Sequence, residues 1–212
     1  MMRYSRLHRH PVKHWTPRYL FDRFELALYK RAHPDVPWLT PTMVEVLTSW
    51  LKPDDIGLEW GSGRSTLWFA RKVGRLISVE HTESWYQKIK SRIEDDGFSH
   101  VEYHLRKDKQ SYVAVTEAIP AESLDFCLVD GLARDACAVA SLPLIKPGGL
   151  IIVDDNQRYF PSDSRSPHAR RPSEGAASEE WEMFLQQVKD WRKIQTTSGV
   201  TDTVLFVKPV KL

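Results

Sequence analysis

The sequence predicts a single α/β domain built around a doubly wound, mostly parallel sheet. Three observations lead to this prediction. From residue 56 onward, five short apolar runs follow one another, with helical patterns between them. The length of 212 residues suits one domain with a sizeable core. A glycine-rich turn follows the first apolar run, at the edge where open α/β sheets bind their ligands.

The five apolar runs are short and rich in β-branched residues, which is typical of strands buried on both faces. In chain order they are Ile56–Trp60, Leu76–Glu80, Val101–Leu105, Leu124–Val129 and Leu150–Val153. The helices predicted between them are Thr66–Val73, Trp85–Ile93, Tyr112–Ile119 and Ala133–Ile145, the last stopped by Lys146-Pro147-Gly148-Gly149. Regular alternation of strand and helix makes neighbouring strands parallel through right-handed crossovers.

The last third of the chain has a different pattern. Residues 157–177 hold three prolines and several serines, which indicates a lid or a mobile loop. A helix over Ser178–Trp191 follows. The strands Lys193–Thr197 and Thr203–Val207 then form a terminal hairpin, so that the ligand-binding domain spans 55–212.

Residues 1–54 are assigned to a basic arm and to helices that pack on the core and cover the ligand site. The two helices are predicted at Tyr19–Lys30 and Pro41–Leu51. Residues 1–21 contain no acid and five cations, namely Arg3, Arg6, Arg9, Lys13 and Arg18. Such an arm suits weak contact with anionic lipid, contact with phosphate or a targeting role; the alternative is a solvated tail. His8, His10 and His14 lie in it without an acidic neighbour, so no metal is expected there.

Composition excludes several other classes of protein. Hydrophobic residues make up 42% and charged residues 27%, as in ordinary globular proteins. No apolar run approaches the roughly 18 residues that cross a bilayer. The net charge of +2 does not favour a nucleic-acid partner. Cys127 and Cys137 cannot form a disulfide framework, and free buried thiols suit a reducing compartment, so the expected location is cytoplasmic.

The strongest local signal is the segment Leu58–Thr66, in which a strand ends, a tight turn follows and a helix begins. Gly61 and Gly63 leave room for a ligand beside the main chain, and the free N–H groups of the helix start face that ligand. Glu59 suits a ligand that carries an ammonium group and opposes a pyrophosphate. Thr66 stands where a dinucleotide fingerprint has its third glycine.

Two more acids close later strands at the same edge of the sheet. Glu80 ends the second predicted strand, about 20 residues after the turn, where a carboxylate can accept hydrogen bonds from both ribose hydroxyls. Asp130, in Val129-Asp130-Gly131, ends the fourth strand. Both acids therefore point to a ligand that lies across the carboxyl edge of the sheet.

In their order and spacing, these motifs resemble the class I S-adenosylmethionine-dependent methyltransferases. The matching segments are Glu59–Gly63, Val79–His81, Val129–Gly131 and Lys146–Gly149, and the resemblance covers roughly residues 55–208. It implies a Rossmann-like methyltransferase fold, with a seven-stranded sheet whose last strand is antiparallel. It also implies S-adenosylmethionine as the cofactor and a small molecule as the methyl acceptor.

The resemblance gives roles to individual residues. The glycine turn would cradle the methionine part of the cofactor, the acid after the second strand would bind ribose, and Glu59 and Asp130 would lie near the methionyl ammonium. Asp108 is the nearest candidate for an adenine contact, and His81 would pack on the adenine side. The implied cofactor-binding residues are Glu59, Gly61, Ser62, Gly63, Thr66, Glu80, His81, Asp108 and Asp130. Each has a structural alternative: Glu59 can orient the turn, Glu80 can be a surface acid and Asp130 can cap a helix.

Asp130 together with Asp154-Asp155-Asn156 also resembles the cation-dependent O-methyltransferases of catechol type, in which three oxygen ligands hold a divalent metal. The family's Asp-Asn pair falls one residue early, on Asp154-Asp155, so a metal is not favoured. O-methylation is favoured, with Asp130 and Asp155 as the catalytic residues that remove the acceptor's proton. The alternative is that these polar residues only end a buried strand and cap the loop.

The loop after the fifth strand carries the cations that would select an anionic acceptor, namely Arg158, Arg165, His168, Arg170 and Arg171. A solvated charged loop is the alternative. Other functions stay open: an NAD(P)-dependent oxidoreductase, which the missing third glycine and Glu59 disfavour, and a non-catalytic cofactor-binding protein that acts through partners. An aminopropyl transferase shares the fold, but its glycine turn is more acidic and richer in glycine. The oligomeric state is left open.

Overall fold

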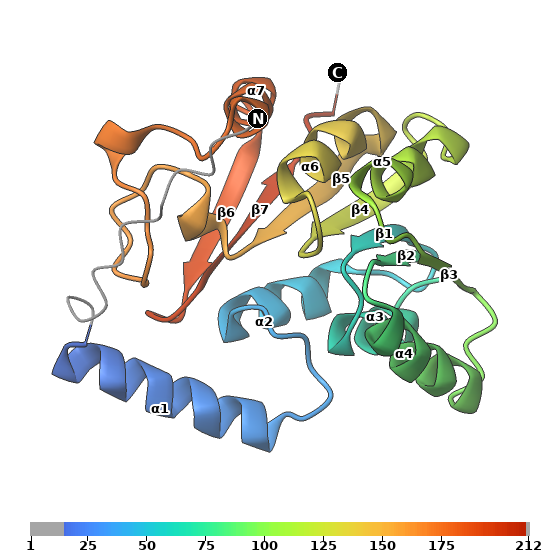
Figure 1. Cartoon of the computed structure of the whole chain (residues 1–212), viewed down its shortest axis with the longest axis horizontal. Coiled ribbons are helices and arrows are strands. Elements are labelled where there is room, and N and C mark those ends of the chain that lie inside the picture. Colours follow the sequence, from blue (N-terminus) through green and yellow to red (C-terminus); the bar gives the residue numbers. More distant parts are fainter. Residues whose placement is uncertain (1–14, 211–212) are drawn as a thin grey trace.

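A computed structural model describes residues 15–210, and one seven-stranded sheet organises them (Figure 1). The strand order is β3-β2-β1-β4-β5-β7-β6. The strands are β1 (Ile56–Trp60), β2 (Arg75–Glu80), β3 (Val101–Leu105), β4 (Leu124–Val129), β5 (Ile145–Asp154), β6 (Arg192–Thr197) and β7 (Asp202–Val207). Strands β1 to β5 pair in parallel, whereas β7 is antiparallel to both β5 and β6. The fold class that the sequence predicts is therefore confirmed, including the antiparallel last strand.

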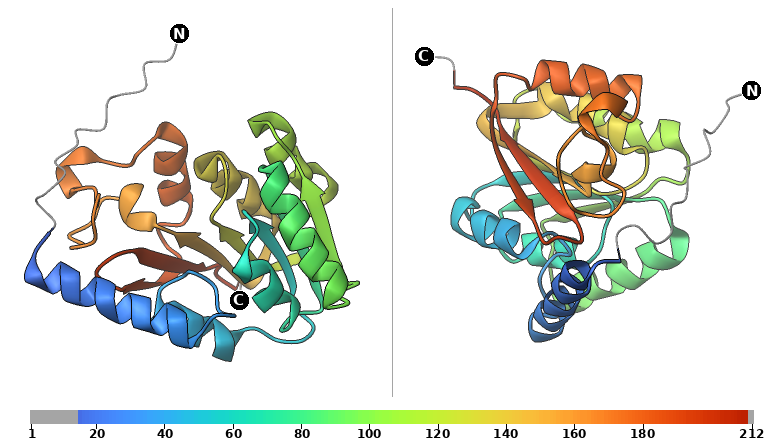
Figure 2. Two further views of the ribbon diagram at one scale, coloured as in Figure 1. Left: turned by 60° about the horizontal axis from the view of Figure 1, so that its bottom comes forward. Right: turned by 90° about the vertical axis from the view of Figure 1, so that its left-hand side faces the viewer.

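Helices cover both faces of the sheet, as the two further views show (Figure 2). They are α1 (Pro17–Ala32), α2 (Pro41–Trp50), α3 (Arg64–Ala70), α4 (Glu83–Asp95), α5 (Lys109–Val113), α6 (Arg134–Ser141) and α7 (Glu179–Gln187). One buried cluster joins α5, α6 and α7 to one face, and a second joins α2 and α3 to the other. Neighbouring strand residues alternate between these clusters, since Cys127 belongs to the first and Phe126 and Leu128 to the second. In the described residues, no helix is long and apolar enough to cross a membrane.

The structure differs from the expected elements where helices end. The helix expected over Ala133–Ile145 stops at Ser141, and a 3₁₀ turn at Leu142–Leu144 leads into β5 at Ile145. The Lys-Pro-Gly-Gly segment therefore lies within β5, where the pairing with β4 changes register. Pro143 cannot donate an N–H group to a continuing helix, which explains the early end. Similarly, the helix expected over Tyr112–Ile119 is α5 followed by a 3₁₀ helix.

The N-terminal helix α1 lies over the turn that joins β6 and β7 (Figure 2). Thr16 caps it by accepting a hydrogen bond from the N–H of Tyr19 (3.2 Å). Asp22 packs so closely on the turn that a Cβ atom at Gly199 would collide with its carboxylate. The N-terminal histidines and most cations of the basic arm, residues 3–14, lie outside the described residues.

The proline-rich segment 157–177 is folded back on itself. The N–H of Ser162 donates to the carbonyl of Arg170, and the N–H of Arg170 donates to the carbonyl of Gln157. Ser166 is buried, and its hydroxyl donates to Asp202 at the start of β7 (2.6 Å). This segment therefore has defined contacts with the sheet beside the end of β5.

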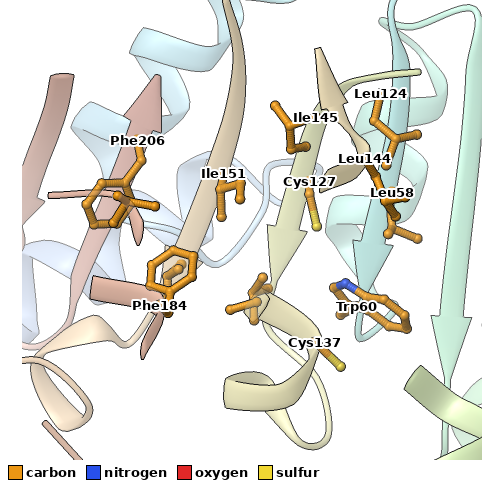
Figure 3. Packing of buried hydrophobic residues seen from close by; sticks show 14 of the residues in the cluster. Leu58, Trp60, Leu124, Cys127, Cys137, Leu144, Ile145, Ile151, Phe184 and Phe206 are labelled. Carbon is orange, nitrogen blue, oxygen red and sulfur yellow. The ribbon is translucent and has the colours of Figure 1, made fainter. Parts of the chain in front are cut away.

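An aromatic group anchors α7 to the sheet. The ring of Phe184 lies 5.5 Å from that of Phe206 on β7 and 5.6 Å from that of Trp181, both nearly perpendicular. Figure 3 shows Phe184, Phe206 and Ile151 packed on this face of the sheet. Such edge-to-face contacts favour one fixed arrangement of the rings.

Replacing Phe184 by Ala tests this anchor. We expect the free energy of unfolding to fall by about 3–5 kcal/mol, because a fully buried ring leaves a cavity. Met183 is the matched control, since it is the next residue on the same helix and is exposed; Met183→Ala should change the value by less than about 0.5 kcal/mol. Denaturant unfolding measures both, and equal midpoints for the two variants would contradict the assignment.

Candidate functional site

The glycine turn after β1 meets the turn after β4 at the carboxyl edge of the sheet. The N–H of Gly61 donates to the carbonyl of Val79 (2.9 Å), and the N–H of Asp130 donates to the carbonyl of Trp60 (2.9 Å). Gly61 has a positive φ of 92°, and a Cβ atom there would lie 2.7 Å from the Cα of Gly131. Glycine is therefore required at 61 both for backbone conformation and for the contact between the two turns.

Glu80, at the end of β2, holds the glycine turn in place. One carboxylate oxygen accepts hydrogen bonds from the N–H (3.1 Å) and the hydroxyl (2.8 Å) of Ser62. The other accepts from the N–H groups of His81 (2.8 Å) and Thr82 (2.7 Å). The indole N–H of Trp85 donates to the carbonyl of Ser62 (2.7 Å). The ends of β1 and β2 are thus tied together through one carboxylate.

Glu59 lies beneath this turn and is fully buried. Its Oε2 atom accepts from the hydroxyls of Thr66 (2.6 Å) and Ser78 (2.7 Å), and the N–H of Gly63 donates to Thr66 Oγ1 (2.9 Å). Burial raises the pKa of Glu59 to about 7. Its Oε1 atom has no hydrogen-bond partner in the described residues. Glu59 therefore orients the turn through the Thr66 hydroxyl, and the Ser78 hydroxyl ties the same carboxylate to β2.

Two cavities open at this edge. The inner cavity, of about 370 Å³, is lined by residues that include Gly61, Ser62, Glu80, His81, Asp130 and Arg134. The outer cavity, of about 770 Å³, extends between α3, α4 and the segment before α2. Because Ser62, Trp85 and Asp130 line both, the two form one crevice. Both volumes lie in the usual range for ligand pockets, roughly 300–1,000 Å³.

Arg134 joins the ends of β4 and β5. Its guanidinium donates to the carboxylate and the carbonyl of Asp130 and to the carbonyl of Asp154 (2.8 Å). Its centre lies 5.7 Å from the centre of the Tyr159 ring. Burial raises the pKa of Asp130, although the charge of Arg134 opposes this effect. Burial, with the nearby charges of Asp130 and Asp155, also raises the pKa of Asp154.

Asp155 has a different environment from its neighbour. Its backbone is left-handed (φ 54°), and its carboxylate accepts hydrogen bonds from Thr201 and Gln157. Burial acts to raise the pKa of Asp155, but the Thr201 hydrogen bond and the charges of Arg158 and Arg134 outweigh it and lower the pKa. The Asp155 carboxylate is thus held at the turn between β6 and β7.

The oxygen ligands named by the catechol-type resemblance, Asp130 and Asp154-Asp155-Asn156, lie at the ends of β4 and β5. Within residues 15–210, no group of three His, Cys, Asp or Glu side chains could hold a metal ion. Asn156 is buried, and its side-chain oxygen lacks a hydrogen-bond partner among these residues. The cation observed between the ends of β4 and β5 is the guanidinium of Arg134.

Several other residues singled out in the sequence lie away from the crevice. Asp108 caps α5, where its carboxylate accepts from the N–H and hydroxyl of Ser111, which lower its pKa. Arg170 and Arg171 donate to carbonyl groups of their own loop, and Arg158 approaches Asp155 (3.7 Å). These arginines stabilise the loop after β5.

The outer cavity contains residues that the sequence did not single out. Its lining includes Trp38, Arg64, Arg71, Lys88 and Arg92. Trp38 is 55% exposed, and the cationic groups of Lys30 and Arg64 lie 5.2 and 5.4 Å from the centre of its ring. Among these residues, only Arg64 has a signal in the sequence, since it directly follows Gly63 in the glycine-turn motif.

Replacing Glu59 by Gln removes a buried titratable group. The pKa of Glu59 is raised from 4.5 to about 7 in the folded protein, so its ionisation costs stability as the pH rises through this range. From about pH 4.5 to about pH 7, we expect the wild type to lose up to about 3 kcal/mol of unfolding free energy relative to Glu59→Gln. Urea unfolding of both proteins at several pH values measures this, and parallel pH profiles would refute it.

The chain is similar to methyltransferases both in part of its sequence and in its fold. Residues 58–156 match a family model described as a methyltransferase domain. The O-methyltransferase TomG from Streptomyces achromogenes, solved in complex with S-adenosylmethionine, is 22% identical with a TM-score of 0.57, over 86% of this chain and 89% of its own. A methyltransferase from Geobacter sulfurreducens is 14% identical with a TM-score of 0.56, over 89% of this chain and 88% of its own.

A third solved structure, an rRNA methylase from Streptococcus thermophilus, is 14% identical with a TM-score of 0.51, over 78% of this chain and 93% of its own. At these identities the likeness concerns the fold. No curated protein matches the sequence. Residues 58–156, a little under half of the chain, therefore match a methyltransferase domain family, and the described residues have the fold of solved methyltransferases.

Proposed function

We propose that the protein is an S-adenosylmethionine-dependent methyltransferase that methylates an oxygen of a small anionic acceptor. The observation that carries this proposal is the inner cavity, which is bounded by Glu80 on one side and Asp130 on the other. In this proposal, residues 55–212 form the catalytic domain, and the helices between residues 15 and 54 cover the acceptor side.

The charges of the inner cavity fit a cationic nucleoside. Two carboxylates, Glu80 and Asp130, line it, and its arginine, Arg134, is already paired with Asp130. A sulfonium with an ammonium group suits this arrangement, whereas the pyrophosphate of a nicotinamide dinucleotide would be repelled. Glu80 would hold the ribose, the turn from Gly61 to Gly63 would face the methionine part and His81 would flank the adenine. Glu59 and Thr66 would support the turn from below.

The bound cofactor would supply an electrophilic methyl group, so the protein has to position the acceptor and remove its proton. Asp130 lines both cavities, and its raised pKa favours proton uptake. The acceptor's O–H would give its proton to this carboxylate as its oxygen attacks. Arg134 would hold the Asp130 side chain in place. The Thr201 contact of Asp155 favours an orienting role for that second candidate base.

The outer cavity favours an anionic acceptor. Its charged lining has more cations than acids, with Arg64, Lys88 and Arg92 facing the same space as Trp38. A carboxylate or phosphate would be held by these cations beside the Trp38 indole. Arg134 already places a positive charge between the ends of β4 and β5, which favours proton removal without a divalent metal.

The ribose assignment is tested by Glu80→Ala. We expect S-adenosylmethionine binding to weaken by roughly 1–3 kcal/mol, because a charged hydrogen-bond acceptor is lost. Glu94→Ala is the matched control, since Glu94 is an exposed acid on α4 whose partner is Lys90. Isothermal titration calorimetry measures both variants. Unchanged affinity in a folded Glu80 variant, or tight binding of a nicotinamide dinucleotide to the wild type, would count against the proposal.

The acceptor class is tested with matched pairs of phenols. Protocatechuate and caffeate should be methylated faster than their uncharged amides, because the cations of the outer cavity select the carboxylate. In the Arg64→Ala variant, this preference should decrease through a higher KM for the acids. Release of S-adenosylhomocysteine measures the reaction. Equal rates for acids and amides would contradict an anionic acceptor and leave the cofactor assignment standing.

A further inference from the structure

Positive charge is concentrated at the start of the chain. Residues 1–32 hold eight of the chain's 30 Lys or Arg and two of its 28 Asp or Glu, which leaves 22 and 26 for residues 33–212. The segment 1–32 is therefore strongly basic and the rest of the protein is slightly acidic. An asymmetry of this kind indicates a partner with an anionic surface.

Helix α1 exposes a continuous apolar surface in the same region. Leu20, Phe21, Phe24 and Leu28 are 49–60% exposed, and their spacing places them on about a third of the helix circumference. We call these four residues the α1 apolar stripe. The opposite side of α1, with Tyr19, Asp22 and Leu26, is buried against the protein. The stripe thus faces solvent, although it consists of leucine and phenylalanine side chains of the kind that usually pack in a hydrophobic core.

Cations accompany the stripe. Arg18 and Arg23 lie on α1 beyond the two edges of the apolar arc, by the same helical spacing. Trp15, 53% exposed, lies two residues before the start of the helix. A helix with Phe and Leu on its outer face, flanking arginines and an adjacent Trp has the composition of helices that lie in the interface of a membrane.

We propose that α1 and the basic segment before it dock this protein on the surface of an anionic membrane. The apolar stripe would enter the acyl boundary, and the cations of residues 1–32 would contact the lipid headgroups. A second copy is less suitable as the occupant, because a two-fold interface through α1 would bring two strongly basic segments together. Nucleic acid would satisfy the charges but leave the aliphatic Leu20 and Leu28 without apolar partners.

The test is co-sedimentation of the full chain with vesicles. One set contains phosphatidylcholine alone and the other contains equal amounts of phosphatidylcholine and phosphatidylglycerol. The wild type should bind the anionic vesicles, bind the neutral ones far less and dissociate as salt is added. Phe24→Glu should lower the partition coefficient by roughly tenfold or more, since an inserted ring becomes a carboxylate that the lipid repels.

Two matched variants separate the possible causes. Phe24→Gln should also weaken binding, because it removes the apolar contact without adding charge, and Met183→Glu, an exposed site on α7, should bind as the wild type does. Circular dichroism confirms that each variant is folded. The proposal is overturned if anionic vesicles do not bind, if both vesicle types bind equally, or if Met183→Glu is as defective as Phe24→Glu. A dimer in sedimentation equilibrium that Phe24→Glu dissociates would instead assign the stripe to a second copy and also overturn it.

Discussion

The site depends on the four hydrogen bonds that Glu80 accepts at the end of β2. Two come from Ser62 in the glycine turn and two from the backbone of residues 81–82. One carboxylate therefore fixes the loops that follow β1 and β2, which lie beyond the paired strands. Charge-assisted bonds of this kind are stronger than neutral ones, and here they are largely shielded from water. The shape of the inner cavity is therefore set before any ligand binds.

A second layer of polar contacts supports the first. Glu59, Thr66 and Ser78 form a buried network below the turn, and Arg134 spans the ends of β4 and β5. Both arrangements place an ionisable group in a poorly hydrated site, which raises the pKa values of Glu59 and Asp130. Since groups with shifted pKa values concentrate at functional sites, this electrostatic pattern agrees with the position of the crevice.

The strands could be predicted to within a residue or two, because short β-branched runs on a buried sheet have few alternatives, and β5 alone starts five residues early. Glu80, Asp130 and the glycine turn could be predicted as site residues because they stand at strand ends.

Helix ends were predicted less well, because the 3₁₀ turns at residues 114–118 and 142–144 keep an apolar spacing close to that of an α-helix. The contact of the Asp155 carboxylate with Thr201 could not be predicted, because it accompanies a left-handed backbone at Asp155 that the residue type does not indicate. Trp38 and Lys88 meet at the outer cavity only through tertiary packing, which a motif does not encode.

The Ser62 hydroxyl has a consequence for how the crevice is filled. It donates to Glu80 while lying 2.6 Å from the hydroxyl of Tyr103. It therefore occupies the Glu80 oxygen that, in the proposed function, would accept a hydrogen bond from a ribose hydroxyl. Under the proposed function, a sugar hydroxyl would replace Ser62 on Glu80, and Tyr103 offers the released Ser62 hydroxyl a second partner. This exchange would need a rotation of the Ser62 side chain, while the separate hydrogen bond from the N–H of Ser62 to Glu80 keeps the glycine turn in place.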